Sequence, residues 1–354
     1  GGRSKDTWVL ADGPVNPVTL LAPLDPIHLE PATTELPSRV AENLFWLGRY
    51  VERAEHIVRL LRGFVARLAE HDATDDPRQM SALLRVLVGL KLLPKEFSKT
   101  AGLRQLEEET IELIARQSPH TGLRNTLNEV RRLASAVRDR LSVDTWRILN
   151  LLQQDMRLRQ GRIQFEEVLV HLNRIITDLA AFSGMEMENM TRGHGWRFLN
   201  LGRRLERSMN LVDVLRGALA VEEAEGGIVE PLLEIADSSM TYRRRYYAQP
   251  RLAPALHLLL ADDTNTRGLA FQLAAVSEHI LRLPRDPRAP SPTREDRLIA
   301  HARATLTEII VSQTWSEDDH TRLDALLGSL ADDLKDVSDA ITYFYFSHAE
   351  MRVS

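Results

Sequence analysis

Arginine and glutamate side chains gather on one face of the first predicted helix. Arg49, Glu52, Arg53 and His56 follow one another at intervals of three and four residues, which places them on the same side of a helix. Aromatic and aliphatic neighbours surround this face, so we expect the helix to be buried and its charges to be partly desolvated. Three interpretations are open: a structural ion network, which is favoured, a site whose second arginine holds a carboxylate or phosphate, and simple surface charge.

The same residue types recur 154 positions later in the chain. Leu47-Gly48-Arg49, Glu52-Arg53 and Arg62-Gly63 return as Leu201-Gly202-Arg203, Glu206-Arg207 and Arg216-Gly217. Seven identities at one fixed offset, within one apolar pattern, indicate an internal duplication. We predict that the second set, Arg203, Glu206 and Arg207 with Asn210, joins the first in one composite site across a pseudo-twofold axis.

The chemistry of these clusters allows three uses. In the first, which we favour, the arginines hold carboxylate or phosphate groups of a peptide or partner, and Glu52 and Glu206 orient them. In the second, the two glutamates converge as a carboxylate pair for acid/base or metal-assisted chemistry, which requires proximity and shifted pKa values. In the third, the chain is a purely structural domain that forms a homo-oligomer. The favoured use predicts no catalytic and no metal-binding residue in this segment.

A second arginine-rich motif spans residues 237–247. It places Tyr242, Arg243 and Arg245 among further tyrosines, and we treat these three residues as a candidate anion or partner site. A helix end packed by tyrosines is the favoured alternative. Nucleic-acid binding is the weakest, because 45 Lys and Arg residues against 50 Asp and Glu give the chain a net charge of −5.

Two polar segments are weaker candidates. Asp262 and Asp263 carry the oxygen ligands that suit Mg²⁺, but capping of the following helix is the favoured interpretation. The segment from Glu186 to His194, which precedes the second copy, is interpreted as a loop. The sequence contains no motif for a phosphate-binding loop, a serine nucleophile elbow, a zinc protease or a dinucleotide site.

Helices must position all of these residues. Six of the 16 prolines fall within the first 37 residues and none lies between His120 and Glu230, so we expect a helical body from Ser38 onward. We predict an all-α fold of roughly ten to twelve helices, a large bundle of two pseudo-symmetric halves at about residues 38–182 and 183–354. Residues 1–37 are predicted to form a short strand at positions 7–10 and a proline-rich extended tether.

Composition excludes several classes of protein. The 354 residues contain no cysteine, which removes disulfides, thiolate nucleophiles and Cys-ligated metals and suits a reducing, cytoplasmic compartment. No apolar run approaches the ~18 residues of a membrane span, and we expect neither a membrane nor a nucleic-acid partner. The chain begins without Met or a signal peptide, so we interpret it as a piece of a longer chain.

The motifs together resemble the alpha-E family, a helical domain named for its Glu-Arg motif. The resemblance runs from about Ser38 to the C-terminus and rests on residues 38–55, 195–207, 240–246, 269–273 and 345–348. One departure is the turn at residues 265–268, Asn-Thr-Arg-Gly, where the family more usually has Asn-Pro-Arg-Ser. The resemblance implies an all-helical domain that has no established reaction of its own.

Residues 1–10 resemble the closing segment of a circularly permuted ATP-grasp domain, a type fused to or encoded beside alpha-E domains. That resemblance implies an ATP-dependent ligase that joins carboxylates to amines through an acyl phosphate, with ATP and Mg²⁺ used by the ligase and no cofactor in this segment. It also implies partners with transglutaminase-like or peptidase folds, in a bacterial system that makes or modifies a peptide. We therefore expect a non-catalytic scaffold that docks the ligase or positions its peptide substrate, using Arg49, Glu52, Arg53, Arg203, Glu206, Arg207, Tyr242, Arg243 and Arg245.

Overall fold

The computed structural model describes residues 10, 12–14, 36–69, 77–93, 110, 122–154, 165–219, 227–247, 249–285, 288, 290–312 and 320–346. All regular secondary structure in these ranges is helical, which confirms the predicted all-α class. The chain divides into two units, Gly1–Glu35 and Leu36–Ser354. The expected strand, except Leu10, and most of the tether lie outside the described residues. None of the described helices is long and apolar enough to cross a membrane.

The described part of the chain contains twelve α-helices in the following order: α1 (Ser38–Ala69), α2 (Pro77–Gly89), α5 (Leu123–Ala136), α6 (Val143–Gln154), α7 (Phe165–Asn189), α8 (His194–Leu219), α9 (Val229–Ile235), α10 (Ser239–Tyr246), α11 (Leu252–Leu256), α12 (Leu269–Leu281), α13 (Arg294–Ser312) and α14 (His320–Phe346). A 3₁₀ turn (η1, Arg138–Arg140) follows α5, and a π-helical turn (η2, His257–Ala261) follows α11. Helix α1 begins at Ser38, the position predicted from the end of the proline-rich segment.

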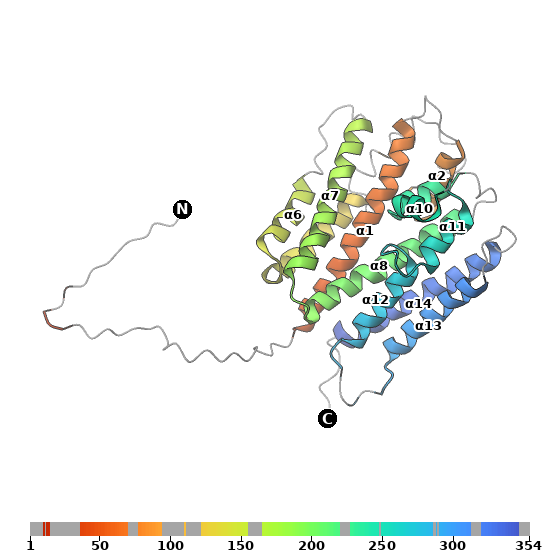
Figure 1. Ribbon diagram of the computed structural model, residues 1–354. Helices are drawn as coiled ribbons and strands as arrows, with labels where there is room; N and C mark the ends of the chain where they lie inside the picture. The colour runs from red at the N-terminus through yellow and green to blue at the C-terminus, as the bar shows by residue number, and fades with distance from the viewer. Residues whose placement is uncertain are drawn as a thin grey trace. The chain divides into compact units, whose positions relative to one another are not determined.

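Helices α1 and α8, which carry the two copies of the repeat, pack against each other in the helical unit. Their apolar seams are buried, with Leu47 and Val51 on α1 and the equivalent Leu201 and Leu205 on α8 all inaccessible to solvent. The two helices start close together and diverge toward their C-terminal ends (Figure 1).

One glycine from each helix lets the two backbones touch at the crossing. A Cβ atom on Gly48 would lie 2.1 Å from the carbonyl oxygen of Leu199, and one on Gly202 would lie 2.1 Å from that of Phe45. Leu199 is the residue that corresponds to Phe45 in the repeat. The contact is therefore equivalent from both sides, and neither position has space for a side chain.

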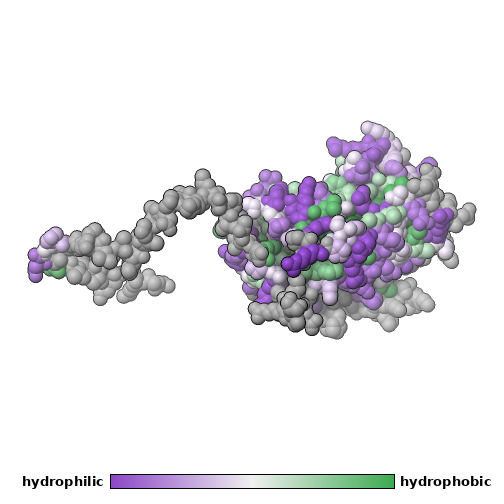
Figure 2. Space-filling model, turned by 90° about the horizontal axis from the view of Figure 1, so that it is seen from below, coloured by the Kyte–Doolittle hydropathy of each residue, from purple (hydrophilic) through white to green (hydrophobic). Residues whose placement is uncertain are grey.

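The other helices cover this central pair. Helices α5 and α7 pack on α1, α12 and α14 pack on α8, and α13 packs on both α12 and α14. Hydrophilic side chains dominate the described surface seen from below, and apolar areas there are small (Figure 2). Burial of the leucine-rich helix faces inside supplies the main stabilisation. The division expected between residues 182 and 183 falls within the continuous helix α7, so the boundary between the two halves stays a prediction.

Candidate functional site

Glu206 of α8 binds both arginines of the first copy. Its carboxylate accepts hydrogen bonds from Arg49 Nε at 2.6 Å and from Arg53 Nε at 2.7 Å. The rest of the Arg49 guanidinium has neutral partners, because Nη1 donates to Ser338 Oγ at 2.6 Å and Nη2 to Met209 Sδ at 3.2 Å. We call Arg49, Arg53 and Glu206 the Glu206 cluster.

Glu52 of α1 binds both arginines of the second copy in the same way. It accepts hydrogen bonds from Arg203 Nε at 2.9 Å and from Arg207 Nη2 at 2.7 Å. Here the rest of the Arg203 guanidinium has a charged partner, because Nη1 donates to the Glu186 carboxylate while Nη2 donates to Ser183 Oγ at 2.7 Å. We call Glu52, Arg203 and Arg207 the Glu52 cluster.

The reciprocal pairing follows from the positions of these residues beside the crossing. Arg49 follows Gly48 directly, and Arg53 lies one helical turn further on, so both side chains reach across to α8 from the same face of α1. The same spacing beside Gly202 directs the second pair of arginines toward α1. The structure thus brings the two predicted Arg/Glu triples together, and each glutamate serves the opposite copy.

Burial and charge act against each other on Glu52. Its side chain is 3% exposed, which disfavours the ionised form, but the guanidinium groups of Arg207 and Arg203 outweigh burial and hold the pKa of Glu52 below its ordinary value. For Arg203, burial disfavours the charged form, but the nearby carboxylates of Glu52 and Glu186 favour it more strongly. The pKa of Arg203 is therefore raised. The glutamate is therefore a fixed anion at neutral pH and a hydrogen-bond acceptor for both arginines.

A ring of further ion pairs extends the Glu52 cluster. Glu55 accepts hydrogen bonds from Arg59 Nε at 3.0 Å and from Arg267 Nη1 at 2.8 Å. Asp237 accepts from the same two arginines at 2.9 Å and 3.0 Å. Burial raises the pKa of Glu55, but the charges led by Arg267 overcome it and lower the pKa to about 2. Four carboxylates, with Glu186, thus accompany the four arginines on this side.

Two cavities flank the fork between α1 and α8. The first, which we call the Glu52 cavity, has a volume of about 40 Å³ and includes an apolar wall. It is lined by Glu52, Glu55, His56, Arg59, Arg207, Asn210, Leu211, Val214, Leu232, Ile235, Ala236 and Arg267. The second, the Glu206 groove, has a volume of about 640 Å³ and is lined by Arg49, Tyr50, Arg53, His56, Ile57, Leu90, Leu92, Gly122, Asn125, Thr126, Asn128, Glu129, Glu206, Met209, Asn210 and Asp213.

His56 and Asn210, which occupy equivalent positions in the repeat, line both cavities. The Nε2 atom of His56 is buried and has no hydrogen-bond partner among the described residues. Burial lowers the pKa of His56 to about 4, although the charges of Glu206, Glu55 and Glu52 favour protonation. The imidazole is therefore neutral at physiological pH.

Exposure distinguishes the arginines of the two clusters. The Arg53 side chain is 35% exposed, whereas the equivalent Arg207 is 15% exposed and donates two hydrogen bonds to Glu52. The Arg53 guanidinium lies 4.9 Å from the centre of the Tyr50 ring, which together with Glu206 fixes its position in the groove. A positioned and accessible guanidinium can bind a carboxylate or a phosphate.

Neither of the two cavities is lined by both glutamates. Glu52 lines the Glu52 cavity and Glu206 lines the Glu206 groove, and both are occupied by arginine donors. Within the described residues, no group of three or more His, Asp or Glu side chains is placed to hold a metal ion. Neither of these two cavities is therefore the cleft, lined by both glutamates, that the acid/base hypothesis expects.

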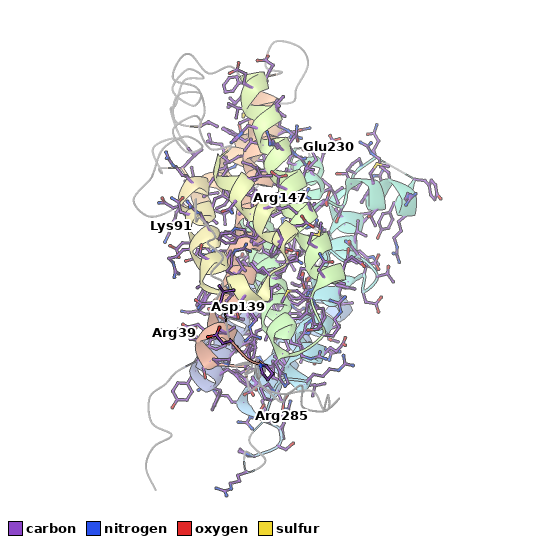
Figure 3. All side chains as sticks on the ribbon, turned by 90° about the vertical axis from the view of Figure 1, so that its left-hand side faces the viewer. Arg39, Lys91, Asp139, Arg147, Glu230 and Arg285 are labelled. Carbon is purple, nitrogen blue, oxygen red and sulfur yellow. The ribbon has the colours of Figure 1, made fainter. Side chains whose placement is uncertain are left out.

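The second arginine-rich motif lies outside both cavities. Tyr242 is buried, and its hydroxyl joins two backbone groups, donating to Gln249 O at 3.2 Å and accepting from Arg251 N at 3.0 Å. Arg243 is exposed and lies 3.9 Å from Glu230, which is labelled in Figure 3. The structure therefore does not bring Tyr242 or Arg243 to the central clusters, and the tyrosine packs the helix end.

The polar turns have structural roles. Arg245 pairs with Asp262, whose carboxylate also accepts from Thr264 N at 3.0 Å, so Asp262 stabilises the turn that follows η2. Glu186 differs from the sequence interpretation, because it lies in the last part of α7 rather than in a loop. There its carboxylate also accepts from Asn200 Nδ2 at 3.0 Å.

Sequence reasoning missed several members of the network. Glu55 carried a usable signal, because it lies three residues after Glu52 and so shares its helix face. Arg267 lies in the turn that departs from the alpha-E pattern, yet it retains the arginine and joins Glu55 to Asp237. Ser338, on α14, had no local signal.

Comparisons with known proteins agree with this architecture. The profile of the Alpha-E family, described as a predicted alpha-helical domain with a conserved ER motif, matches residues 36–346. The chain is 28% identical to the uncharacterized protein Rv2567 of Mycobacterium tuberculosis and 28% identical to the uncharacterized protein Mb2597 of Mycobacterium bovis. Each match covers 96% of this chain but 41% of the relative, so the chain spans about two fifths of their length. No solved structure matches the chain.

Proposed function

Because the chain belongs to the Alpha-E family, we propose that its helical unit is a non-catalytic binding module that serves a circularly permuted ATP-grasp amide ligase. The module holds a peptide substrate of the ligase, or a segment of a partner, in the Glu206 groove. The single observation that carries the binding role is Arg53, a guanidinium fixed by Glu206 and Tyr50 and one-third exposed in a groove of about 640 Å³.

The state of the glutamates supports a non-catalytic role. A general acid or base works best with a pKa near the operating pH, whereas the pKa of Glu52 is lowered further from neutrality by its two arginines. Both glutamates accept hydrogen bonds from guanidinium groups on both carboxylate oxygens. In this proposal they orient arginines and transfer no proton.

The link to a ligase rests on two other observations. Residues 1–10 resemble the end of a circularly permuted ATP-grasp domain, and more than half of each mycobacterial relative lies outside the match. ATP and Mg²⁺ are then bound by the ligase, and this segment supplies no cofactor site. Partners with transglutaminase-like or peptidase folds, and a cytoplasmic location, belong to the same proposal.

The test is reconstitution of the module with a circularly permuted ATP-grasp protein from the same source. Light scattering after size-exclusion chromatography should show a mixed complex, and peptide-dependent ADP release should rise when the module is added. Formation of the mixed complex without a change in ADP release would limit the module to docking. Absence of both would overturn the proposal.

Two controls separate this function from the alternatives. The module alone, incubated with the peptide and the peptide product, should leave both unchanged, because it lacks a catalytic pair. A purely structural oligomerisation domain would instead form a homo-oligomer that neither binds the peptide nor alters the ligase.

A further inference from the structure

The two clusters differ by one charged residue of the repeat. In the first copy, Glu55 lies three residues after Glu52, within 3.8 Å of the Arg207 guanidinium. The corresponding residue of the second copy is Met209, which lies in the Glu206 groove and offers only its sulfur to Arg49. The Glu206 cluster therefore lacks the second carboxylate that the Glu52 cluster has.

The first arginine of each copy also has a second partner, which is charged in the Glu52 cluster and neutral in the Glu206 cluster. Arg203 donates to Glu186, a carboxylate, whereas Arg49 donates at 2.6 Å to the hydroxyl of Ser338. Two arginines and one glutamate leave one positive charge uncompensated within the Glu206 cluster. A partly buried guanidinium whose positive charge is not balanced by neighbouring anions favours the binding of a further anion.

No other carboxylate of the described chain fills this place. Glu129 lines the groove but pairs with Arg132 at 2.8 Å. Asp213 also lines it, but it follows Glu206 by seven residues, about 10 Å along the helix axis, and makes no ion pair with the cluster among the described residues. Of the described carboxylates, Glu206 alone lies within 4.0 Å of the Arg53 guanidinium.

We propose that a carboxylate group of the bound ligand supplies the second carboxylate that the Glu206 cluster lacks, because the repeat has Met209 in place of Glu55, and that this group pairs with Arg53. This inference rests on the proposed function and specifies its ligand, because the group that binds the equivalent arginine, Arg207, is a carboxylate. The groove walls add apolar contacts from Ile57, Leu90 and Leu92, which suit an aliphatic side chain next to that carboxylate.

The experiment compares N-acetyl-Ala-Leu, which has a free carboxylate, with its carboxamide by calorimetric titration of the helical chain. The acid should bind at least about tenfold more tightly than the amide. An N-acetylated, C-terminally amidated Ala-Glu-Ala distinguishes a side-chain carboxylate from a C-terminal one as the source. Inorganic phosphate should not displace the acid at equal concentration, and displacement would overturn the carboxylate assignment in favour of a general anion site.

Variants locate the contact. Arg53→Gln should weaken binding of the acid to the level of the amide, and Arg53→Lys, which keeps the charge but loses the planar fork, should recover part of the loss. The matched control is Arg147→Gln on α6, an exposed arginine labelled in Figure 3, which should leave binding unchanged. The thermal midpoint of each variant verifies that it is folded.

The outcomes separate this inference from the proposed function. Equal binding of acid and amide, or parent-like acid binding by folded Arg53→Gln, would overturn the carboxylate contact while peptide binding by the module stands. Binding of neither peptide would contradict both.

Discussion

The Glu52 and Glu206 clusters contain the same residue types at the same helical spacing, yet one is closed and the other is open. Around Glu52, Glu55 and Glu186 supply further carboxylates to the arginines. Around Glu206, Met209 and Ser338 stand in their places, and Arg53 faces a groove. Residues outside the repeated motif therefore decide whether the arginines of such a cluster are surrounded by carboxylates or meet neutral partners and a groove.

The largest expected effect concerns the crossing of α1 and α8, which supports both clusters. Gly48→Ala and Gly202→Ala each place a methyl group 2.1 Å from a backbone carbonyl oxygen, so both should destabilise the protein by at least about 3 kcal/mol. Chemical denaturation measures the change. Gly184→Ala is the control, because a Cβ there meets nothing within 4 Å and should stabilise α7 by about 0.5–1 kcal/mol. Tolerance of either crossing substitution would contradict the equivalence of the two helices.

The next prediction compares how much each of the two glutamates stabilises the folded protein. Glu206→Gln leaves the buried Arg49 without any carboxylate and should cost about 3–5 kcal/mol in the free energy of unfolding. Glu52→Gln should cost less, about 1–3 kcal/mol, because Arg203 keeps Glu186 and Arg207 keeps Glu55 as anionic partners. Urea denaturation of the two variants provides the comparison. Equal costs, or a larger cost at Glu52, would contradict the assignment of Glu55 and Glu186 as further anions of the Glu52 cluster.

Acid should weaken the closed region through Glu55. Its pKa is 4.5 ordinarily and about 2 in the folded protein, so the folded state holds the proton less tightly than the unfolded state. The stabilisation is complete above pH 4.5 and is lost as pH falls toward 2, by about 3 kcal/mol. Denaturation at several pH values should show this loss, and Glu55→Gln should remove that part of the profile. An unchanged profile in the variant would argue against the ion-pair ring.

The effect expected from His56, which lies between the two cavities, is smaller within the interval from pH 7 to pH 5, because only part of its pKa shift falls there. Its pKa falls from 6.5 to about 4 on folding, so the unfolded state takes up a proton first and stability declines as pH drops from 6.5 to 4. His56→Asn, which introduces the residue of the equivalent position, should flatten that decline. Thermal midpoints measured at pH 7 and pH 5 suffice. A decline as steep in His56→Asn as in the parent would assign it to other groups, such as His279, whose pKa is also lowered to about 4, chiefly by burial.

Local patterns predicted the helices better than they predicted the network. Spacing along α1 and α8 is a property of neighbouring residues, so the start at Ser38 and the shared face of Arg49, Glu52 and Arg53 were readable from the chain. The partners that distinguish the clusters come from distant elements. Ser338 lies 289 positions from the arginine that it contacts, and no periodicity encodes that pairing.

The arginines of residues 243–245 show how little residue density says about pairing. Their density predicted a candidate site, but Arg245 forms an ion pair with Asp262, which stabilises a turn. Composition identifies charges without showing which are already paired, because pairing depends on tertiary contacts.

The most direct test of the open Glu206 cluster supplies the missing carboxylate from the protein itself. Met209→Glu places in the second copy the residue that Glu55 provides in the first, with Met209→Leu as the neutral control. The thermal midpoint of Met209→Glu should equal or exceed that of the parent, and its affinity for N-acetyl-Ala-Leu should fall at least about tenfold, while Met209→Leu binds as the parent does. Parent-like binding of the peptide acid by folded Met209→Glu would contradict the account.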